Sequence, residues 1–439
     1  MAFYLFLLLN GTMFIRPAEI VEDVAALPIY EWLILSCVAA SLPGILSQLN
    51  QNSLAEHPIT LCVLALLPAI FLSQISHGIW WRARDGSTEF SKIIIYFLLL
   101  MANVNSVARL RSFTGWLLGF ISAAALLAVL QFHGVINLPS LSTIYDLEID
   151  PETGLEFEVP RICSTGIFND PNDLAMILTL GLILTAYFLT DARLRALAPV
   201  WLGVAGLLFY GLILTKSRGG LLALSVAGFV LVQARYGWRK ALFWAGPGVL
   251  AMMVLVGGRQ ADIGGAVGGD TGQSRIQLWS QGLALLRGRS LVFGIGHNTY
   301  AEEVGQVAHN SFVHAFVELG FFGGAAFLGA FYYSIRSLYR LREMHAWPVD
   351  AELVRFRPFL LAALAGFGAS MLSLSRNDIA TPYLMLGIAA AFLDFSRVAR
   401  SPGDLRFDAN LLKTFAKISV AFLAGTYVFI RVFARWSGQ

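Results

Sequence analysis

The sequence has few charged residues, and this shortage excludes a water-soluble globule. Charged residues make up 13% of the 439 positions, about half of the share that is usual in soluble proteins. Hydrophobic residues make up 57%, and the mean hydropathy is +0.67. The formal net charge of +3 is too small to indicate a nucleic-acid partner. We therefore predict an integral membrane protein.

Cysteine is also scarce, and the N-terminus lacks positive charge. The three cysteines, Cys37, Cys62 and Cys163, provide neither a disulfide framework nor the paired spacing of a metal site. No basic region precedes the first apolar segment, whereas a signal peptide has one. We expect this segment, which has about 14 residues, to be retained as a short first span or a re-entrant segment.

Long apolar runs occur along the whole chain and predict the fold class. Backbone polar groups must satisfy one another inside a bilayer, so each run is expected to be a helix. Several runs are short against the roughly 20 residues needed to cross, and we predict an all-α polytopic membrane protein with about twelve transmembrane helices in a single integral membrane domain, residues 1–439. After the N-terminal segment the runs lie at about 29–46, 58–77, 90–106, 113–133, 172–190, 197–215, 219–235, 240–257, 311–334, 358–374, 380–395 and 413–432.

Arginine and lysine in short loops favour the cytoplasm, and their distribution predicts the sidedness. The basic loops all fall on one side if every run from residue 113 onward crosses the membrane. These loops are RLR at 109–111, DARLR at 191–195, RYGWRK at 235–240, RSLYRLRE at 336–343 and the connection 397–413. The opposite side, the periplasm in a Gram-negative bacterium, receives a loop at 134–171, the turn at 216–220, a large loop at 258–310 and SRND at 375–378.

Four ionisable residues near helix ends fall on the predicted periplasmic side: Arg161, Arg218, Arg275 and His309. Ionisable groups at membrane depth are costly and commonly mark function. Each has a structural alternative, because a single arginine can extend to lipid headgroups and a single histidine often only stabilises its helix. Their occurrence together favours a site for an anionic, lipid-linked substrate, since guanidinium groups match phosphate and a neutral imidazole can accept a proton.

Local patterns predict how two of these segments begin their helices. In FNDPND, Asp170 is expected to be an N-cap, with Pro171 at the first helical position and Asn172 in the first turn. In TKSRGG, the two glycines permit a tight reversal and a close backbone approach, which holds Arg218 at the membrane surface.

The large loop 258–310 has three recognisable parts. Its glycine-rich beginning is expected to be flexible. Ser274 and Gln277 then have the spacing of a capping box, so Arg275 is expected at the start of an interfacial helix. The apolar face of that helix contains Ile276, Trp279, Leu283 and Leu286. In GIGHNTY, the single GxG is no nucleotide-binding signature, and His297 is expected to be exposed.

Polar residues recur within the segment HNSFVHAFVELG. Asn310 is expected either to cap the helix or to orient an acceptor. His314 and Glu318 are four residues apart and can share a metal ion, but no third ligand has a useful spacing, so a structural hydrogen bond is favoured. The acidic run 145–158 is likewise interpreted as a solvated loop and not as a cation site.

An ordered set of motifs resembles the O-antigen ligase and O-antigen polymerase superfamily. The motifs are RPAEI (16–20), FNDPNDLA (168–175), SRGG (217–220), SRIQLW (274–279), GIGHNTY (294–300) and HNSFVHAFVELG (309–320). They occur in order across most of the chain. The resemblance implies a many-span enzyme of the bacterial inner membrane that transfers glycans from undecaprenyl pyrophosphate without a nucleotide sugar, a cofactor or, for ligases, a metal.

The resemblance also implies the reaction and the site residues. RPAEI favours a ligase, which joins O-antigen to lipid A–core at the periplasmic face; a polymerase and a protein O-oligosaccharyltransferase remain alternatives. A transporter or flippase for an anionic lipid is the alternative of another class, but no clear internal repeat supports it. His309 is the expected general base. Pyrophosphate is expected to bind Arg218, Arg275 and Arg161, with support from Asn310, His314, Glu318 and Asn172.

Overall fold

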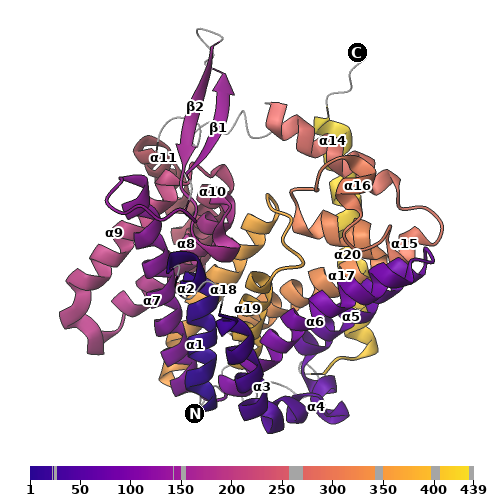
Figure 1. Ribbon diagram of the computed structural model, residues 1–439, viewed down its shortest axis with the longest axis horizontal. Helices are drawn as coiled ribbons and strands as arrows, with labels where there is room; N and C mark the ends of the chain where they lie inside the picture. Colours follow the sequence, from indigo (N-terminus) through magenta and orange to yellow (C-terminus); the bar gives the residue numbers. More distant parts are fainter. Residues whose placement is uncertain are drawn as a thin grey trace. The chain divides into compact units, whose positions relative to one another are not determined.

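Figure 1 shows the computed structural model, which describes residues 1–21, 23, 27–141, 143–149, 155–256, 270–341, 350–396 and 406–434. Helices make up most of this part, and one pair of strands is the only sheet within these ranges. Contacts between residues divide the chain into two compact units, each assembled from three separate stretches of sequence. The predicted all-α polytopic architecture is confirmed.

Unit 1 consists of Met1–Ser41, Ala108–Ala261 and Val354–Ser370. Helix α8 is central to it, because it contacts α9 and α10 and most of its side chains are buried. The elements of unit 1 are α1 (Ala2–Ile15), α2 (Pro17–Ile20), the first part of α3 (Ile29–Gln48), α7 (Val107–Phe132), β1 (Ile144–Ile149), β2 (Glu156–Arg161), η2 (Gly166–Phe168), α8 (Pro171–Leu189), η3 (Ala192–Leu197), α9 (Ala198–Leu214), α10 (Arg218–Tyr236), α11 (Trp238–Val256) and most of α18 (Ala351–Met371).

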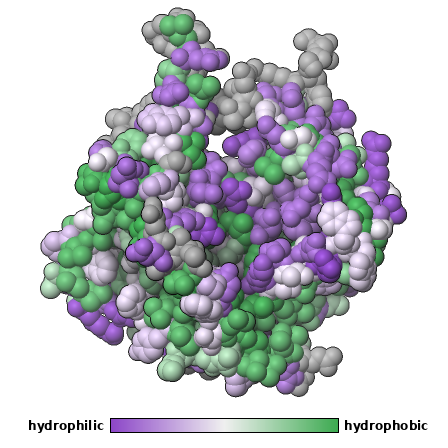
Figure 2. Space-filling view, viewed as in Figure 1, coloured by the Kyte–Doolittle hydropathy of each residue, from purple (hydrophilic) through white to green (hydrophobic). Residues whose placement is uncertain are grey.

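Unit 2 consists of Leu42–Val107, Asp262–Leu353 and Met371–Gln439. Helix α17 is central to this unit and contacts α5, α14, α15, α16, α19 and α20. The elements are α4 (Gln51–Glu56), α5 (Pro58–Ile75), α6 (Trp80–Asn103), α14 (Asp270–Ala284), α15 (Ser290–Phe293), α16 (Tyr300–Val304), α17 (Ser311–Arg340), α19 (Ala380–Phe395) and α20 (Ala409–Phe433). On the face shown in Figure 2, hydrophilic side chains gather over α16.

Nine helices in the described ranges are long and apolar enough to cross a membrane. They are α3, α5, α7, α8, η3 continued by α9, α10, α17, α18 and α20; α19 is apolar but has only 16 residues. Helix α6 is not among the nine, because its first half contains a run of charged residues from Arg82 to Lys92. The chain is therefore a multi-pass membrane protein, while the expected number of about twelve spans stays a prediction.

An ion cluster marks one end of unit 1. Arg111 of α7 and Arg355 of α18 both pair with Asp191, which follows α8 and is almost fully buried. The predicted cytoplasmic segments 109–111 and 191–195 therefore lie at the same end of this unit. Asn172 lies at the opposite end of α8, so the helix separates the ion cluster from that predicted site residue.

Two local predictions are wrong, and some others fall outside the described residues. Residues 109–111 are not a loop, because α7 already begins at Val107. The acidic run 145–158 belongs to a hairpin in which β1 pairs with β2 in antiparallel register, Asp146 opposite Val159. Alternating side chains on both sides of an intervening Pro–Glu–Thr–Gly are the sequence signal of such a hairpin. The described ranges do not include 150–154, the glycine-rich 257–269, 342–349 or 397–405.

The ion cluster makes a prediction about stability. Burial opposes ionisation of Asp191, but the backbone N–H of Arg193 and the charges of Arg355 and Arg111 hold the pKa of this carboxyl below its usual value. Asp191 therefore stabilises the fold at a pH above its unfolded pKa, and this contribution is lost as the pH falls towards the lower folded pKa. Asp191→Asn should reduce the free energy of unfolding by roughly 1–3 kcal/mol at neutral pH.

The measurement is thermal unfolding of the purified protein between pH 7 and pH 3. The variant should lose less stability on acidification than the unmodified chain does. Asp85→Asn is the matched control, because Asp85 is half exposed and pairs only with the exposed Arg84. Equal effects of the two substitutions would contradict the stabilising role of the cluster.

Candidate functional site

In unit 1, the side chain of Arg161 joins three elements. It lies at the end of β2 and is 8% exposed. Its Nε donates to the carbonyl of Thr215 at 2.8 Å, Nη1 to the Asp146 carboxylate at 2.7 Å and Nη2 to Asn172 Oδ1 at 3.2 Å. Three of the five guanidinium N–H donors are therefore used within the protein. Arg161 fixes the base of the hairpin to the start of α8 and to the turn before α10.

The starts of α8 and α10 are tied directly to each other. Asp170 caps α8 by accepting the N–H of Asn172 at 2.7 Å, as predicted. Ser217 caps α10 by accepting the N–H of Gly220, and its hydroxyl donates to Asn172 Oδ1 at 2.7 Å. A Cβ at Gly220 would lie 2.5 Å from the Cβ of Ala175, so the two helices approach more closely than a side chain permits.

The position of Arg218 is set by these hydrogen bonds at the starts of α8 and α10. Arg218 is the first residue of α10 and is half-buried at the end of unit 1 that also carries Arg161 and Asn172. The structure thus brings these three predicted residues together around one set of buried hydrogen bonds. The cap by Ser217 and its hydrogen bond to Asn172 fix the main chain at the start of α10, where Arg218 is the first helical residue.

The motif RPAEI contacts the same region, which the sequence alone did not indicate. Glu19 accepts the N–H of Gly166 at 2.8 Å, and the hydroxyl of Thr165 donates to the carbonyl of Ile15 at 2.9 Å. Arg16 pairs with Glu19. Residues 15–19 therefore stabilise the loop that leads into α8.

In unit 2, hydrogen bonds fix the chain on both sides of His309. The carbonyl of Ala308 accepts the indole N–H of Trp279 at 2.6 Å. Asn310 is the N-cap of α17, and its Oδ1 accepts the N–H groups of Phe312 and Val313. His309 itself is half-buried, just before the helix begins.

The backbone of His309 is in the left-handed region, with a φ of 49°. A residue with a side chain is strained there by roughly 1–3 kcal/mol, and such strain persists only where the surroundings impose it. Within the described ranges the non-glycine residues with positive φ are Arg16, Lys216, Asn298 and His309. Each lies within or directly beside one of the motifs that carry the family resemblance.

Glu318 lies about two turns after the start of α17 and binds the backbone of the loop 294–300. It is 1% exposed and accepts the N–H groups of Asn298 and Tyr300 at 3.0 and 3.1 Å. His314 Nε2 lies 3.1 Å from the same carboxylate, which confirms the favoured structural hydrogen bond. Burial, and then the charge of Glu318, raise the pKa of Tyr300.

His297 is not the exposed loop histidine that was expected. It is 6% exposed, and its Nδ1 lies 3.6 Å from Glu318, which is too long for a hydrogen bond. Its backbone N–H donates to Ser73 Oγ of α5 at 3.1 Å. The prediction fails because the loop 294–300 is bonded along α17 and α5, and no local pattern in the sequence reports that contact.

A pair of glycines permits this close contact. Gly294 lies directly against the backbone of α17, because a Cβ on it would lie 2.0 Å from the carbonyl oxygen of Glu318. Gly320 interrupts α17 with φ 64° and ψ −166°, and a Cβ there would lie 2.4 Å from the backbone of Val292 and Gly294. The neighbouring N–H groups of Ile295 and Gly296 bond to the carbonyls of Val317 and Glu318.

The predicted start of the interfacial helix is wrong. Helix α14 begins at Asp270, so Ser274 and Gln277 lie within the helix and not at its start. They therefore form no capping box, and Arg275 lies in the second turn. The predicted apolar face is largely confirmed, since Ile276 is buried and Trp279 packs against the cluster around Tyr300. The capping-box spacing of Ser274 and Gln277 predicted the wrong helix start, because the residues from Asp270 onward extend the helix by one turn.

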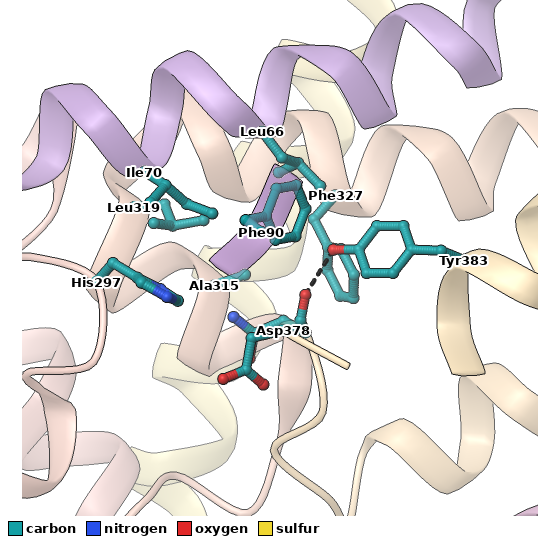
Figure 3. Close-up of a pocket in the computed structure, with 10 residues that line it drawn as sticks. Leu66, Ile70, Phe90, His297, Ala315, Leu319, Phe327, Asp378 and Tyr383 are labelled. Atoms are coloured by element: carbon teal, nitrogen blue, oxygen red, sulfur yellow. Dashed lines mark hydrogen bonds between the residues drawn. The ribbon is translucent and has the colours of Figure 1, made fainter. Parts of the chain in front are cut away.

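Figure 3 shows a pocket within unit 2, lined mostly by apolar side chains. The imidazole of His297 and the carboxylate of Asp378 lie on one side of it, and the hydroxyl of Tyr383 donates to the carbonyl of Asn377. The pocket has no room for a water molecule and therefore none for a sugar. Among the described residues, no group of three potential ligands is arranged around a metal position.

The predicted residues thus form two sets, each fixed within its own unit. Unit 1 holds Arg161, Asn172 and Arg218, and unit 2 holds Arg275, His309, Asn310, His314 and Glu318. A set of cations and a histidine next to a capped helix suit chemistry on a phosphorylated, hydroxyl-bearing substrate.

Comparison with known proteins agrees with this chemistry. Residues 203–328 match the model of a protein family described as O-antigen ligase. The matched segment is under a third of the chain and includes Arg218, Arg275, His309 and Glu318. No curated protein matches the chain. The resemblance to the O-antigen ligase superfamily, whose members are glycosyltransferases of the ligase and polymerase type, is confirmed over this segment.

The contact between Gly320 and the loop at Gly294 makes a prediction. Gly320→Ala should destabilise the protein by more than about 2 kcal/mol, because the side chain meets backbone atoms and the backbone conformation is essentially restricted to glycine. Thermal unfolding in detergent measures the loss. Gly228→Ala in α10 is the control, since nothing lies within 4 Å of its Cβ position. A Gly320→Ala variant as stable as the control would show that the loop is not held against α17.

Proposed function

We propose that the protein is a glycosyltransferase that transfers O-antigen polysaccharide from undecaprenyl pyrophosphate to a hydroxyl of lipid A–core. The reaction takes place at the periplasmic face of the bacterial inner membrane. One observation carries the proposal: Arg218 and His309, both in the segment matched to the O-antigen ligase family, lie at the starts of apolar helices fixed by buried hydrogen bonds.

The proposed reaction is a single inverting displacement. The oxygen of the acceptor hydroxyl attacks the anomeric carbon of the donor, and the bond from that carbon to the pyrophosphate oxygen breaks. His309 takes the proton of the hydroxyl, and undecaprenyl pyrophosphate leaves with the electron pair. General-base assistance of this kind contributes about 10²–10⁴-fold.

The arginines stabilise the charge that develops on the leaving pyrophosphate, a task that fixed cations can perform without a metal. Arg218 is the principal ligand, because its planar fork matches phosphate oxygens. Arg275 is proposed to stabilise the same developing charge on the pyrophosphate. Arg161 has three internal hydrogen bonds, so its main contribution is to hold the turn 215–217, and its remaining donors are available to the substrate.

The supporting residues act through the backbone. Asn310 holds the start of α17 through its cap, which fixes the strained conformation of His309. Glu318 and His314 hold the loop 294–300, and Asn172 holds Ser217 next to Arg218. These residues place the reacting groups but need not touch the substrate.

The decisive experiment is transfer by the purified protein in nanodiscs. The donor is undecaprenyl-pyrophosphate-linked O-antigen, and the acceptors offered are lipid A–core, a second donor molecule or a peptide. A new glycosidic bond to lipid A–core supports the ligase. Chain extension or peptide glycosylation instead would indicate a polymerase or an oligosaccharyltransferase, and movement of donor across vesicle membranes without any new bond would identify a transporter.

His309 carries the sharpest prediction about activity. His309→Asn keeps a residue that tolerates the left-handed backbone but cannot act as a base, so transfer should slow by about 10²–10⁴-fold while the protein still folds and binds donor. His133→Ala, a change at an exposed histidine outside the proposed site, is the control. For a base, transfer by the unmodified protein falls as the pH is lowered, because protonation removes the acceptor lone pair; a rise on acidification contradicts the assignment.

Arg218→Lys tests the phosphate contact separately. A point charge cannot reproduce a bidentate contact, so transfer should fall by at least about tenfold, and Arg218→Ala should fall further. Initial rates at saturating and limiting donor separate binding from turnover. Near-normal rates in a well-folded Arg218→Ala would remove Arg218 from the site.

Sidedness is tested by labelling intact cells. Glu303→Cys in the exposed α16 should react with a membrane-impermeant maleimide, whereas Arg406→Cys should react only after permeabilisation. The native cysteines in the structure are all buried, which keeps the background low. The reverse pattern would place His309 on the cytoplasmic side and defeat the periplasmic assignment.

A further inference from the structure

We infer that an exposed basic surface of unit 2 binds the phosphate groups of lipid A–core, the acceptor in the proposed function. The inference rests on that function and adds a binding site for the acceptor lipid, whereas the arginines assigned above concern the donor. The turn before α15 and the start of α6 form this surface. It consists of Trp80, Trp81, Arg84, Arg287, Arg289 and Leu291.

Arg287 and Arg289 supply the charge of the basic surface. Both are exposed, and within the described ranges neither guanidinium has a hydrogen bond, an ion pair or an aromatic contact. Gly288 between them has a φ of 58°, and nothing lies within 4 Å of its Cβ position. The two arginines therefore occupy an open turn, and their N–H donors are not used by this part of the chain.

Two segments far apart in the sequence meet at the basic surface. Ser290 directly follows Arg289, and its hydroxyl lies 3.4 Å from Nε2 of His77 in the turn between α5 and α6. Arg82 of α6 donates to Glu302 of α16 at 2.7 Å. Figure 1 shows α15 next to the adjoining ends of α5 and α6. The fold thus holds the two exposed arginines beside the start of α6.

The starts of α6 and α15 add apolar side chains to the basic surface. Trp80, Trp81 and Leu291 are each more than half exposed. The guanidinium of Arg82 lies over the ring of Trp81, 5.1 Å from its centroid. Tryptophan is enriched where a membrane meets water, and arginine at that depth extends to headgroups. The surface therefore suits a ligand that has both phosphates and acyl chains, which is a lipid and not a soluble phosphate.

The charges of the basic surface favour an anionic headgroup. The arginines of α6 have carboxylate partners, Asp85 and Glu302. Arg287 and Arg289 add two positive charges that pair with no carboxylate in the described ranges. Arginines near the ends of spans favour the cytoplasm, so two of them on the predicted periplasmic side run against that preference. Planar guanidinium groups match the oxygens of phosphate, which makes phosphate the expected ligand.

The position of the basic surface along α17 relates it to the acceptor. The chain that follows Arg289 lies against α17, since a Cβ on Gly320 would lie 2.4 Å from the backbone of Val292. Gly320 is about 14 Å of helix from Ser311, the first residue of α17. In lipid A–core the phosphates lie next to the acyl chains and the accepting hydroxyl lies further along the glycan. A lipid held by its phosphates at this level can therefore extend its glycan towards His309.

The experiment measures binding of lipid A–core to the full chain in phosphatidylcholine nanodiscs. The double variant Arg287→Gln/Arg289→Gln should bind this lipid about three- to thirtyfold more weakly, as expected for the loss of two partly exposed charge contacts. Enzymatically dephosphorylated lipid A–core is the second ligand, and the variant should bind it as tightly as the unmodified chain does. The thermal midpoint should not change, because both side chains are exposed.

Matched variants separate this site from a general effect of charge. Arg193→Gln/Arg195→Gln removes two exposed arginines with the same spacing from the segment that follows α8 in unit 1, and lipid binding should not change. Arg287→Lys/Arg289→Lys should retain part of the affinity, because the charge remains while the planar fork is lost. In transfer assays the glutamine double variant at 287 and 289 should raise the KM for lipid A–core, whereas kcat and the KM for the donor should stay the same.

The outcomes distinguish the inference from the function on which it rests. An unchanged affinity of Arg287→Gln/Arg289→Gln for lipid A–core overturns the inference, and normal transfer by the same variant leaves the proposed ligase standing. An equal loss for the phosphorylated and dephosphorylated lipids also overturns it, because the contact is then not with phosphate. If phosphatidylglycerol competes equally for the surface, it is a site for bulk anionic lipid and the inference fails. If the unmodified chain binds lipid A–core through these arginines but forms no glycosidic bond to it, the binding site is supported and the ligase assignment fails.

Discussion

Buried hydrogen bonds at the starts of apolar helices are the interaction on which the rest of this structure depends. A polar group that is removed from water and left unpaired is costly, so each helix start must be satisfied by the protein. Asp170 caps α8, Ser217 caps α10 and Asn310 caps α17, and the Ser217 hydroxyl also donates to Asn172. The same bonds that complete the backbone thereby place Arg218 and His309.

Conformational strain is the counterpart of this arrangement. The turn at Lys216 and the residue His309 have left-handed backbones, and in both cases the neighbouring residues on each side are held by hydrogen bonds. In the proposed function, groups held in this way need little reorganisation when a charged substrate arrives, which favours electrostatic stabilisation of a leaving group. The position of the main chain in each unit thus comes from hydrogen bonds on both sides of the strained residue.

The residues named in the proposed function belong to both compact units. Arg161 and Arg218 lie in unit 1, whereas Arg275, His309 and the loop held by Glu318 lie in unit 2. Both units are assembled from separate stretches of the chain, and the segment matched to the O-antigen ligase family draws on both. A carboxylate as deeply buried as Glu318 is stabilised by two backbone N–H groups and a histidine, which compensates the loss of water.

The sequence by itself determined the membrane class, most of the helices and the cap at Asp170, because apolar periodicity and capping are local properties of the chain. Only the tertiary structure decided that His297 is buried, that α14 begins at Asp270, that Arg161 has three internal partners and that Lys216 is strained. Each of these depends on contacts between segments far apart in sequence, such as Arg161 with Thr215. A single sequence carries no direct record of such contacts, since the same local pattern is compatible with either a free or an engaged side chain.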